Sequence, residues 1–138
     1  MTKYAEHTIR AYQADADLSS YQYYFVEHDA SLVANYVQVA TSGSTTVPLG
    51  ILWDDPTAAG QHCEVVVSGE CKVRANAASA ITYGMLMGFD SSGRATPVVV
   101  GTSSSNAWVM GRFMEALASG SAIIRCELWH GPAKLGTS

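Results

Sequence analysis

Apolar and polar residues alternate with a period of two along much of this chain, the pattern of a strand with one buried face. Between residues 122 and 129 one face is apolar and the other is polar apart from a tryptophan. The apolar face holds Ala122, Ile124, Cys126 and Leu128, and the polar face Arg125, Glu127 and Trp129. By the same rule Cys63, Val65 and Val67 alternate with His62, Glu64 and Val66. We therefore predict that Cys63 and Cys126 point inward and that the glutamates after them point outward.

Short segments rich in aromatic and β-branched residues predict about nine strands. They cover residues 21–27, 32–40, 47–53, 62–67, 70–75, 84–90, 95–100, 107–114 and 122–130. Small polar clusters at 28–31, 41–46, 91–94 and 102–106 predict turns, and Ser68-Gly69 predicts a hairpin turn. The alanines of 76–82 predict one or two helical turns. The fold class that follows is all-β, a small β-barrel of short strands with at most one short helix.

The first 20 residues differ from the rest because they show no sustained apolar period. We therefore predict an extended N-terminal arm at 1–20 and a single β-barrel domain at 21–138. Six of the seven tyrosines lie within the first 36 residues, and tyrosine suits surfaces that are dry on one side and wet on the other. An unanchored arm has no core to fill, so its side chains are candidates for binding a partner. The candidates are Tyr4, Ile9, Arg10 and Tyr12.

A pattern of three glycines occurs twice. In the first copy a strand ends near Gly50, a loop leads to Gly60, and an apolar strand leads to Gly69. The second copy has Gly111, Gly120 and Gly131 in the same order, offset by 61, 60 and 62 residues. Two units are too few for a solenoid, so we expect two strand-loop-strand halves related by a pseudo-twofold within one barrel. The glycines predict backbone positions with positive φ or tight strand crossings.

Composition narrows the function classes. The net charge is −4 and the eight Lys and Arg residues are scattered singly, which disfavours nucleic-acid binding. Membrane spanning is disfavoured because no apolar run approaches about 18 residues, and the first ten residues lack the apolar core of a signal peptide. Charged residues make up 14 % of the chain, against an average of about 25 %. We expect a protein made in cytoplasm whose surface is partly covered by partners.

The three cysteines, Cys63, Cys71 and Cys126, are an odd number in a chain without an export signal, which disfavours a disulfide framework. A hairpin turn at Ser68-Gly69 would place Cys63 opposite Arg74, too far from Cys71 to bridge. We predict small buried thiols.

Catalytic and metal sites are also disfavoured. The candidates are Cys63, Cys71, Cys126, His62, His130, Asp54 and Asp55. None lies in a recognisable nucleophile turn. Cys126 and His130 would lie about 13 Å apart along one strand, too far to share a zinc ion with His62 and Cys63. The acids before Pro56 predict a turn, as does the segment 89–96, which lacks the full set of calcium ligands. No catalytic residue, metal or cofactor is predicted.

Three stretches of the sequence, LGILWDDPTAAGQHCEVVVSGECKV, ITYGMLMGFDSSGRATPV and WVMGRFMEALASGSAIIRCELW, together with the spacing of glycines and short strands, resemble the capsid cement, or head decoration, proteins of tailed bacteriophages. The resemblance covers residues 20–130. It implies a tulip-like β-barrel that binds the outer capsid surface as homotrimers at threefold and quasi-threefold positions, with an N-terminal segment reaching onto the major capsid protein. Proteins of this family have no catalytic residues that could be assigned to positions of this chain.

Two alternative functions stay open. One is a glycan-binding or other ligand-binding barrel that uses Trp53, Trp108 and Trp129 as stacking platforms. The other is a structural protein of the phage tail or neck, which would share the fold and differ in where it docks.

Overall fold

The computed structural model of the chain describes residues 7–29, 31, 35–42, 46–98 and 108–134, except the side chains of His130, Pro132 and Lys134. It is all-β, as predicted, with one turn of 3-10 helix at Ser19–Tyr21. The strands are β1 (His7–Ala14), β2 (Phe25–His28), β3 (Tyr36–Val39), β4 (Pro48–Leu52), β5 (His62–Ala77), β6 (Leu86–Phe89), β7 (Ala95–Pro97), β8 (Trp108–Phe113) and β9 (Gly120–Lys134).

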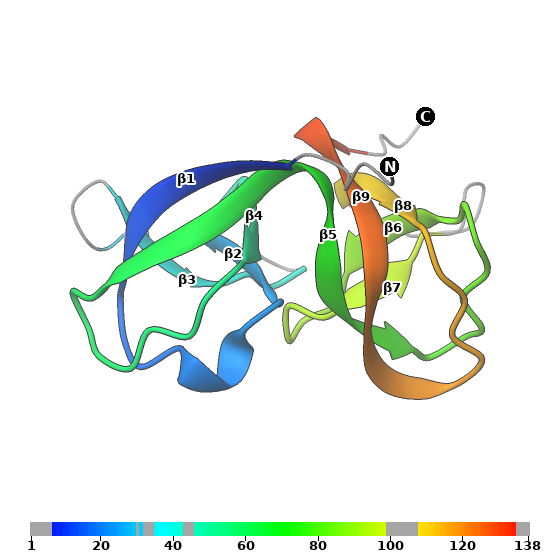
Figure 1. Cartoon of the computed structure of the whole chain (residues 1–138), viewed down its shortest axis with the longest axis horizontal. Coiled ribbons are helices and arrows are strands. Elements are labelled where there is room, and N and C mark those ends of the chain that lie inside the picture. Colours follow the sequence, from blue (N-terminus) through cyan, green and yellow to red (C-terminus); the bar gives the residue numbers. More distant parts are fainter. Residues whose placement is uncertain (1–6, 30, 32–34, 43–45, 99–107, 135–138) are drawn as a thin grey trace, which may run out of the picture.

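The nine strands form two rings that share β5 (Figure 1). The N-terminal ring runs β1-β3-β2-β4 and returns through the first half of β5 to β1. The C-terminal ring runs from the second half of β5 through β7, β6, β8 and β9, which pairs with β5 again. The sequence predicted two halves that close one barrel together. Instead, each half closes its own ring, because β5 is long enough to serve both.

The repeat seen in the sequence is confirmed, and it extends to every strand. In each ring the first and third strands pair in parallel and the remaining pairs are antiparallel. The register repeats as well, since Val26 lies opposite Gly50 and Met87 opposite Gly111, each 61 residues later. A Cβ atom on either glycine would overlap a carbonyl oxygen of the neighbouring strand, that of Val66 or Glu127. The glycines therefore permit a close strand crossing in both rings.

β5 is the largest departure from the predicted elements. Ser68-Gly69 was expected to be a hairpin turn, but β5 runs on through these two residues and is 16 residues long. Gly69 has φ 100 and pairs with His7 on one side and Leu128 on the other, so this glycine marks the passage from one ring to the next. The short helix expected at 76–82 is also absent there, because Asn76 and Ala77 still pair with β9. Tertiary pairing overrides the local turn and helix propensities.

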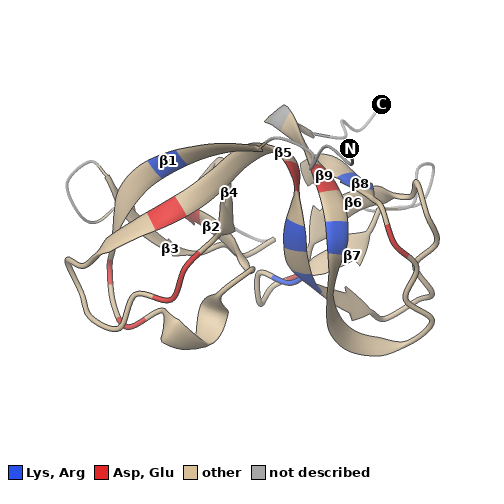
Figure 2. Ribbon diagram, in the orientation of Figure 1, with Lys and Arg blue, Asp and Glu red and all other residues tan. Residues whose placement is uncertain are grey.

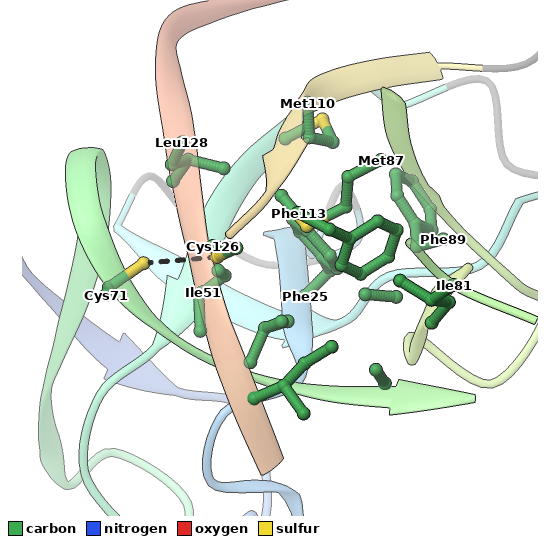
Figure 3. Close-up of a cluster of buried hydrophobic side chains, with 14 of the residues drawn as sticks. Phe25, Ile51, Cys71, Ile81, Met87, Phe89, Met110, Phe113, Cys126 and Leu128 are labelled. Carbon is green, nitrogen blue, oxygen red and sulfur yellow. Dashed lines mark hydrogen bonds between the residues drawn. The ribbon is translucent and has the colours of Figure 1, made fainter. Parts of the chain in front are cut away.

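Two buried clusters hold the rings together. The N-terminal core fills the first ring and consists of Ala14, Leu18, Val26, Val37, Leu52, Cys63 and Val65. The C-terminal core fills the second ring and continues into the junction between the rings, where Phe25 stacks on Phe89 with centroids 5.2 Å apart (Figure 3). Val66 was expected on the outer face of its strand. It is fully buried in the C-terminal core, because the outer face of the N-terminal ring is covered by the other ring.

The N-terminal segment is more ordered than the sequence predicted. Residues 1–20 were expected to form an arm apart from the domain, but His7–Ala14 is a strand that pairs with β5 over seven residues. Ala14 and Leu18 are buried in the N-terminal core. The apolar residues here are few because one short strand needs only one or two side chains to fix it once its backbone is paired. Residues 1–6 of the predicted arm lie outside the described residues.

Candidate functional site

β1 exposes more of its surface than its neighbours in the sheet do. Residues Thr8 to Ala11 are all exposed, and Ile9 retains 38 % of its accessible surface. On one edge β1 pairs with β5, whereas on the other edge β3 pairs only with Gln13 and Ala14. Within the described chain, no strand pairs with that second edge over His7–Tyr12. An exposed row of side chains beside an unpaired strand edge is a template for an added strand.

The four predicted arm residues occupy different environments. Ile9 and Arg10 are exposed, as a partner-binding residue must be before it binds. Tyr12 is half-buried against the N-terminal core, and its ring meets His28 edge-on at 5.8 Å. It therefore also fixes β1 in place. Tyr4 lies outside the described residues.

His7 ties the start of β1 to the centre of the molecule. Its ring packs against Trp53 at 4.9 Å, and its Nδ1 lies 3.1 Å from the carbonyl oxygen of Glu70. Trp53 in turn packs against Tyr23 at 5.4 Å. The start of β1 therefore lies close to the passage of β5 between the rings.

A cleft of about 540 Å³ lies at the junction of the two rings. It is lined by Tyr21, Tyr24, Val39, Ala40, Thr41, Ser91, Ser92 and Arg94. Tyr21 meets Tyr24 edge-on at 5.2 Å and is 38 % exposed. The Arg94 guanidinium pairs with Asp90, from Nε to Oδ2 at 3.2 Å, and this contact lacks the alignment of a hydrogen bond. Sequence reasoning missed this cleft because its walls come from segments about 50 to 70 residues apart.

The cysteines lie where strand alternation placed them. Cys63, Cys71 and Cys126 are all buried thiols, as predicted. Burial and the charge of Asp54 raise the pKa of Cys63 to about 11. The hydrogen bond with Cys71, together with burial, raises the pKa of Cys126 well above its usual range. Cys63 and Cys126 are therefore poor nucleophiles at neutral pH, since the thiolate is the reactive form.

The acidic candidates support loops. Asp54 accepts a hydrogen bond from the Glu64 backbone N–H at 3.1 Å. Asp90 accepts bonds from the backbone N–H groups of Ser92 and Arg94, which confirms the predicted turn at 91–94. Asp55 and His62 are exposed, and the side chain of His130 lies outside the described set. In the described part of the chain, no group of three or more His, Cys, Asp and Glu residues is placed to hold a metal ion.

Two of the three tryptophans pack against the core, and none is fully exposed. Trp53 and Trp108 both lie against the C-terminal core, and Trp129 is half-buried. Lys and Arg residues are scattered over several strands in the view of Figure 2, without a continuous basic band. No helix in the described residues has the length and apolarity to cross a bilayer.

The sequence model of the phage cement proteins matches residues 6–128. The chain belongs to the phage cement protein family. The resemblance noted in the sequence is therefore confirmed, and the cement protein is a structural component of the virion, located on the capsid.

A solved structure shares the fold. It is described as the N base of head fiber gp8.5 in bacteriophage phi29, and the two chains are 14 % identical. The similarity covers 93 % of this chain and 98 % of that chain, with a TM-score of 0.61. At this level of identity the likeness shows a common architecture. No protein with a curated description matches the sequence.

Proposed function

We propose that the cement protein binds the outer surface of an assembled phage capsid as homotrimers at threefold and quasi-threefold positions. There it bridges neighbouring major capsid protein subunits and stabilises the expanded shell. The observation that carries this proposal is the unpaired edge of β1, next to the exposed side chains of Ile9 and Arg10. Family membership supports the capsid as the partner.

The edge of β1 supplies a docking mode that depends little on sequence. An extended segment of a capsid subunit would add a strand beside His7–Tyr12 through main-chain hydrogen bonds. Ile9 would bury apolar surface against that segment, and Arg10 would pair with an acidic side chain or a carbonyl group on it. Tyr4, which precedes β1 in the sequence, is a further candidate contact.

A trimer strengthens such contacts without new chemistry. Three copies held together present three β1 edges at once, so each weak contact gains from a high effective concentration. Because the contact spans subunits only in the expanded lattice, binding favours that lattice by linkage. The low charge content, 14 %, is suited to a protein that buries part of its flank against its copies.

Substitutions on the face of β1 test the docking mode. Ile9→Glu and Arg10→Glu should each lower occupancy on purified shells at least about tenfold, as expected for residues central to an interface, when the shells are sedimented and bound protein is quantified. Ile123→Glu is the matched control, because Ile123 is 41 % exposed on β9 of the other ring and should leave occupancy unchanged. Equal occupancy of the β1 variants and the control would refute the role of β1.

Deleting residues 1–20, the whole predicted arm, is a weaker test than these substitutions. The deletion would remove β1 and also Ala14 and Leu18 from the N-terminal core, so loss of binding could follow from loss of folding. Deleting residues 1–6 keeps all of β1.

Sedimentation velocity across a range of concentrations tests trimerisation directly, and a monomer both free and on the shell would refute the trimer.

A second candidate function rests on the cleft at the ring junction. Its exposed tyrosine, its hydroxyl groups and its guanidinium are the groups with which proteins stack on and hydrogen-bond to sugar rings. Of the tryptophans expected for this role, Trp53 and Trp108 are packed against the C-terminal core, so Tyr21 takes their place in this alternative. Binding on a glycan array that Tyr21→Ala removes would support it. An array without signal, while the protein still binds shells, would eliminate it.

A further inference from the structure

Two of the three cysteines face each other across the longest strand pairing. Cys71 on β5 lies directly opposite Cys126 on β9, in a register that runs from Gly69 to Ala77. Their sulfur atoms are 3.6 Å apart (Figure 3). The sequence did not predict this pair, because a hairpin turn at Ser68-Gly69 would have placed Cys71 opposite Val66. A continuous β5 brings together two residues that are 55 positions apart.

Direct pairing across antiparallel strands brings two cysteines within the distance that a disulfide spans. Directly opposite residues in antiparallel strands have Cα atoms about 4.5 to 5.5 Å apart, within the range of about 4.4 to 6.8 Å found across disulfides. The sulfur atoms must move about 1.5 Å closer to reach the bond length of about 2.0 Å. Rotation about the Cα–Cβ bonds would supply this movement.

We propose that Cys71 and Cys126 are a modification site, at which a low-molecular-weight disulfide such as oxidised glutathione converts the thiol pair into an intramolecular disulfide. The Cys71 thiolate attacks one sulfur of oxidised glutathione, forming a mixed disulfide and releasing one glutathione. The Cys126 thiolate then attacks the Cys71 sulfur, forming the protein disulfide and releasing the second glutathione. Each thiol gives up one proton. The protein loses two electrons, and oxidised glutathione gains them.

The surroundings of the two thiols set the order and speed of these steps. Cys71 is 7 % exposed and Cys126 is fully buried, so the first attack occurs at Cys71. The hydrogen bond between the thiols and the burial of Cys126 raise the pKa of Cys126, which keeps its thiolate scarce at neutral pH. The reaction is therefore slow at neutral pH and faster in alkaline solution. Both thiols persist in reducing compartments and react in oxidising ones.

The cross-link would fix the closure of the C-terminal ring. β9 pairs with β5 along one edge and with β8 along the other, so this pairing joins the two ends of that ring. A disulfide here restricts a long loop of the unfolded chain. The expected rise in the midpoint of thermal unfolding is on the order of 10 °C.

The test uses the full-length folded protein and oxidised glutathione at about pH 8.5, near the ordinary thiol pKa. We expect the intact mass to fall by two hydrogens, peptide mapping to link Cys71 to Cys126, and the unfolding midpoint to rise. Cys63→Ser is the matched control and should react like the parent protein, because Cys63 lies opposite Tyr12 in the other ring. Cys126→Ser should stop at the mixed disulfide on Cys71, and a folded variant that does not react at all would overturn the order of attack.

Mapping of the parent protein requires no variant, so it stays decisive if Cys126→Ser fails to fold. Three free thiols after prolonged incubation, a stable mixed disulfide on the parent protein, or a cross-link that involves Cys63 would each overturn the assignment. An unchanged unfolding midpoint in the cross-linked protein would overturn the role in ring closure.

Discussion

The two rings share one set of strand pairings but differ in what covers their outer faces. In the N-terminal ring, Ile51 and Val66 are fully buried at the junction. The equivalent residues of the C-terminal ring, 61 positions later, are Arg112 and Glu127, which form an ion pair of 2.9 Å with Arg112 exposed. The same backbone thus carries an apolar outer face where a ring meets its neighbour and a charged one where it meets solvent.

The two rings also differ in the side chain that contacts the turn after their second strand, at Asp29 or Asp90. Asp15 shares a side-chain hydrogen bond with Asp29 in the N-terminal ring. At the equivalent place in the C-terminal ring, the Asn76 Nδ2 donates to the Asp90 Oδ2 at 3.3 Å. An amide N–H donates without taking up a proton, whereas two carboxyl groups form a hydrogen bond only when one of them is protonated. The N-terminal ring is therefore the one whose stability depends on pH at this position.

The largest expected effect comes from substitutions at the close strand crossing that the two rings share. Gly50→Ala and Gly111→Ala should each lower the free energy of unfolding by about 3 kcal/mol or more, because the added Cβ overlaps a carbonyl oxygen of the neighbouring strand. Urea denaturation measures this. Gly84→Ala is the control: its φ of +88 costs about 1 to 2 kcal/mol, and nothing lies within 4 Å of the new Cβ. A mild effect at Gly50 with a severe one at Gly111 would show that the two crossings are not equivalent.

A smaller effect on the free energy of unfolding distinguishes the outer faces of the two rings. Ile51→Ala should cost about 3 kcal/mol, since it leaves a cavity at the junction. Arg112→Ala should cost less than about 1 kcal/mol, as expected for an exposed ion pair. Both values follow from the same denaturation experiment. Similar costs for the two variants would contradict the contrast between a buried and a solvated face.

The smallest effect concerns pH. Burial and Asp29 raise the pKa of Asp15 from its usual 3.8 to about 6. The folded state then holds this proton more tightly than the unfolded chain, so stability should fall as pH rises from about 4 to about 6 and level off above. Asp15→Asn should remove this dependence and stabilise the protein at pH 7 by about 1 kcal/mol, allowing for solvent screening.

The reverse substitution sharpens the same comparison. Asn76→Asp should give the C-terminal ring the pH dependence that the N-terminal ring loses in Asp15→Asn. Denaturation at about pH 5 and pH 7 measures both variants. Parallel stability curves for the parent protein and Asp15→Asn across this range would disprove the proton-sharing pair.

Local patterns predicted the strands well where one face is buried. The alternation at 122–128 placed Ile124, Cys126 and Leu128 in the core, and all three are buried. The glycine repeat correctly indicated two related halves. Alternation failed at Val66 because both faces of β5 are covered at the junction, a condition that a period of two does not describe. The predicted hairpin turn at Ser68-Gly69 was wrong because a glycine with positive φ can lie inside a bent, continuous strand as well as in a hairpin turn.

The sequence by itself determined the all-β class, the two related halves, the inward cysteines and the family to which the cement protein belongs. Only the tertiary structure decided that each half closes its own ring, that residues from His7 onward join the sheet, and that Cys71 meets Cys126. The reason is physical. Side-chain alternation and turn chemistry are local properties, whereas strand partners are chosen by pairings between residues far apart in the chain. The residues with the clearest local pattern were therefore placed correctly, and those whose position depends on a distant partner were not.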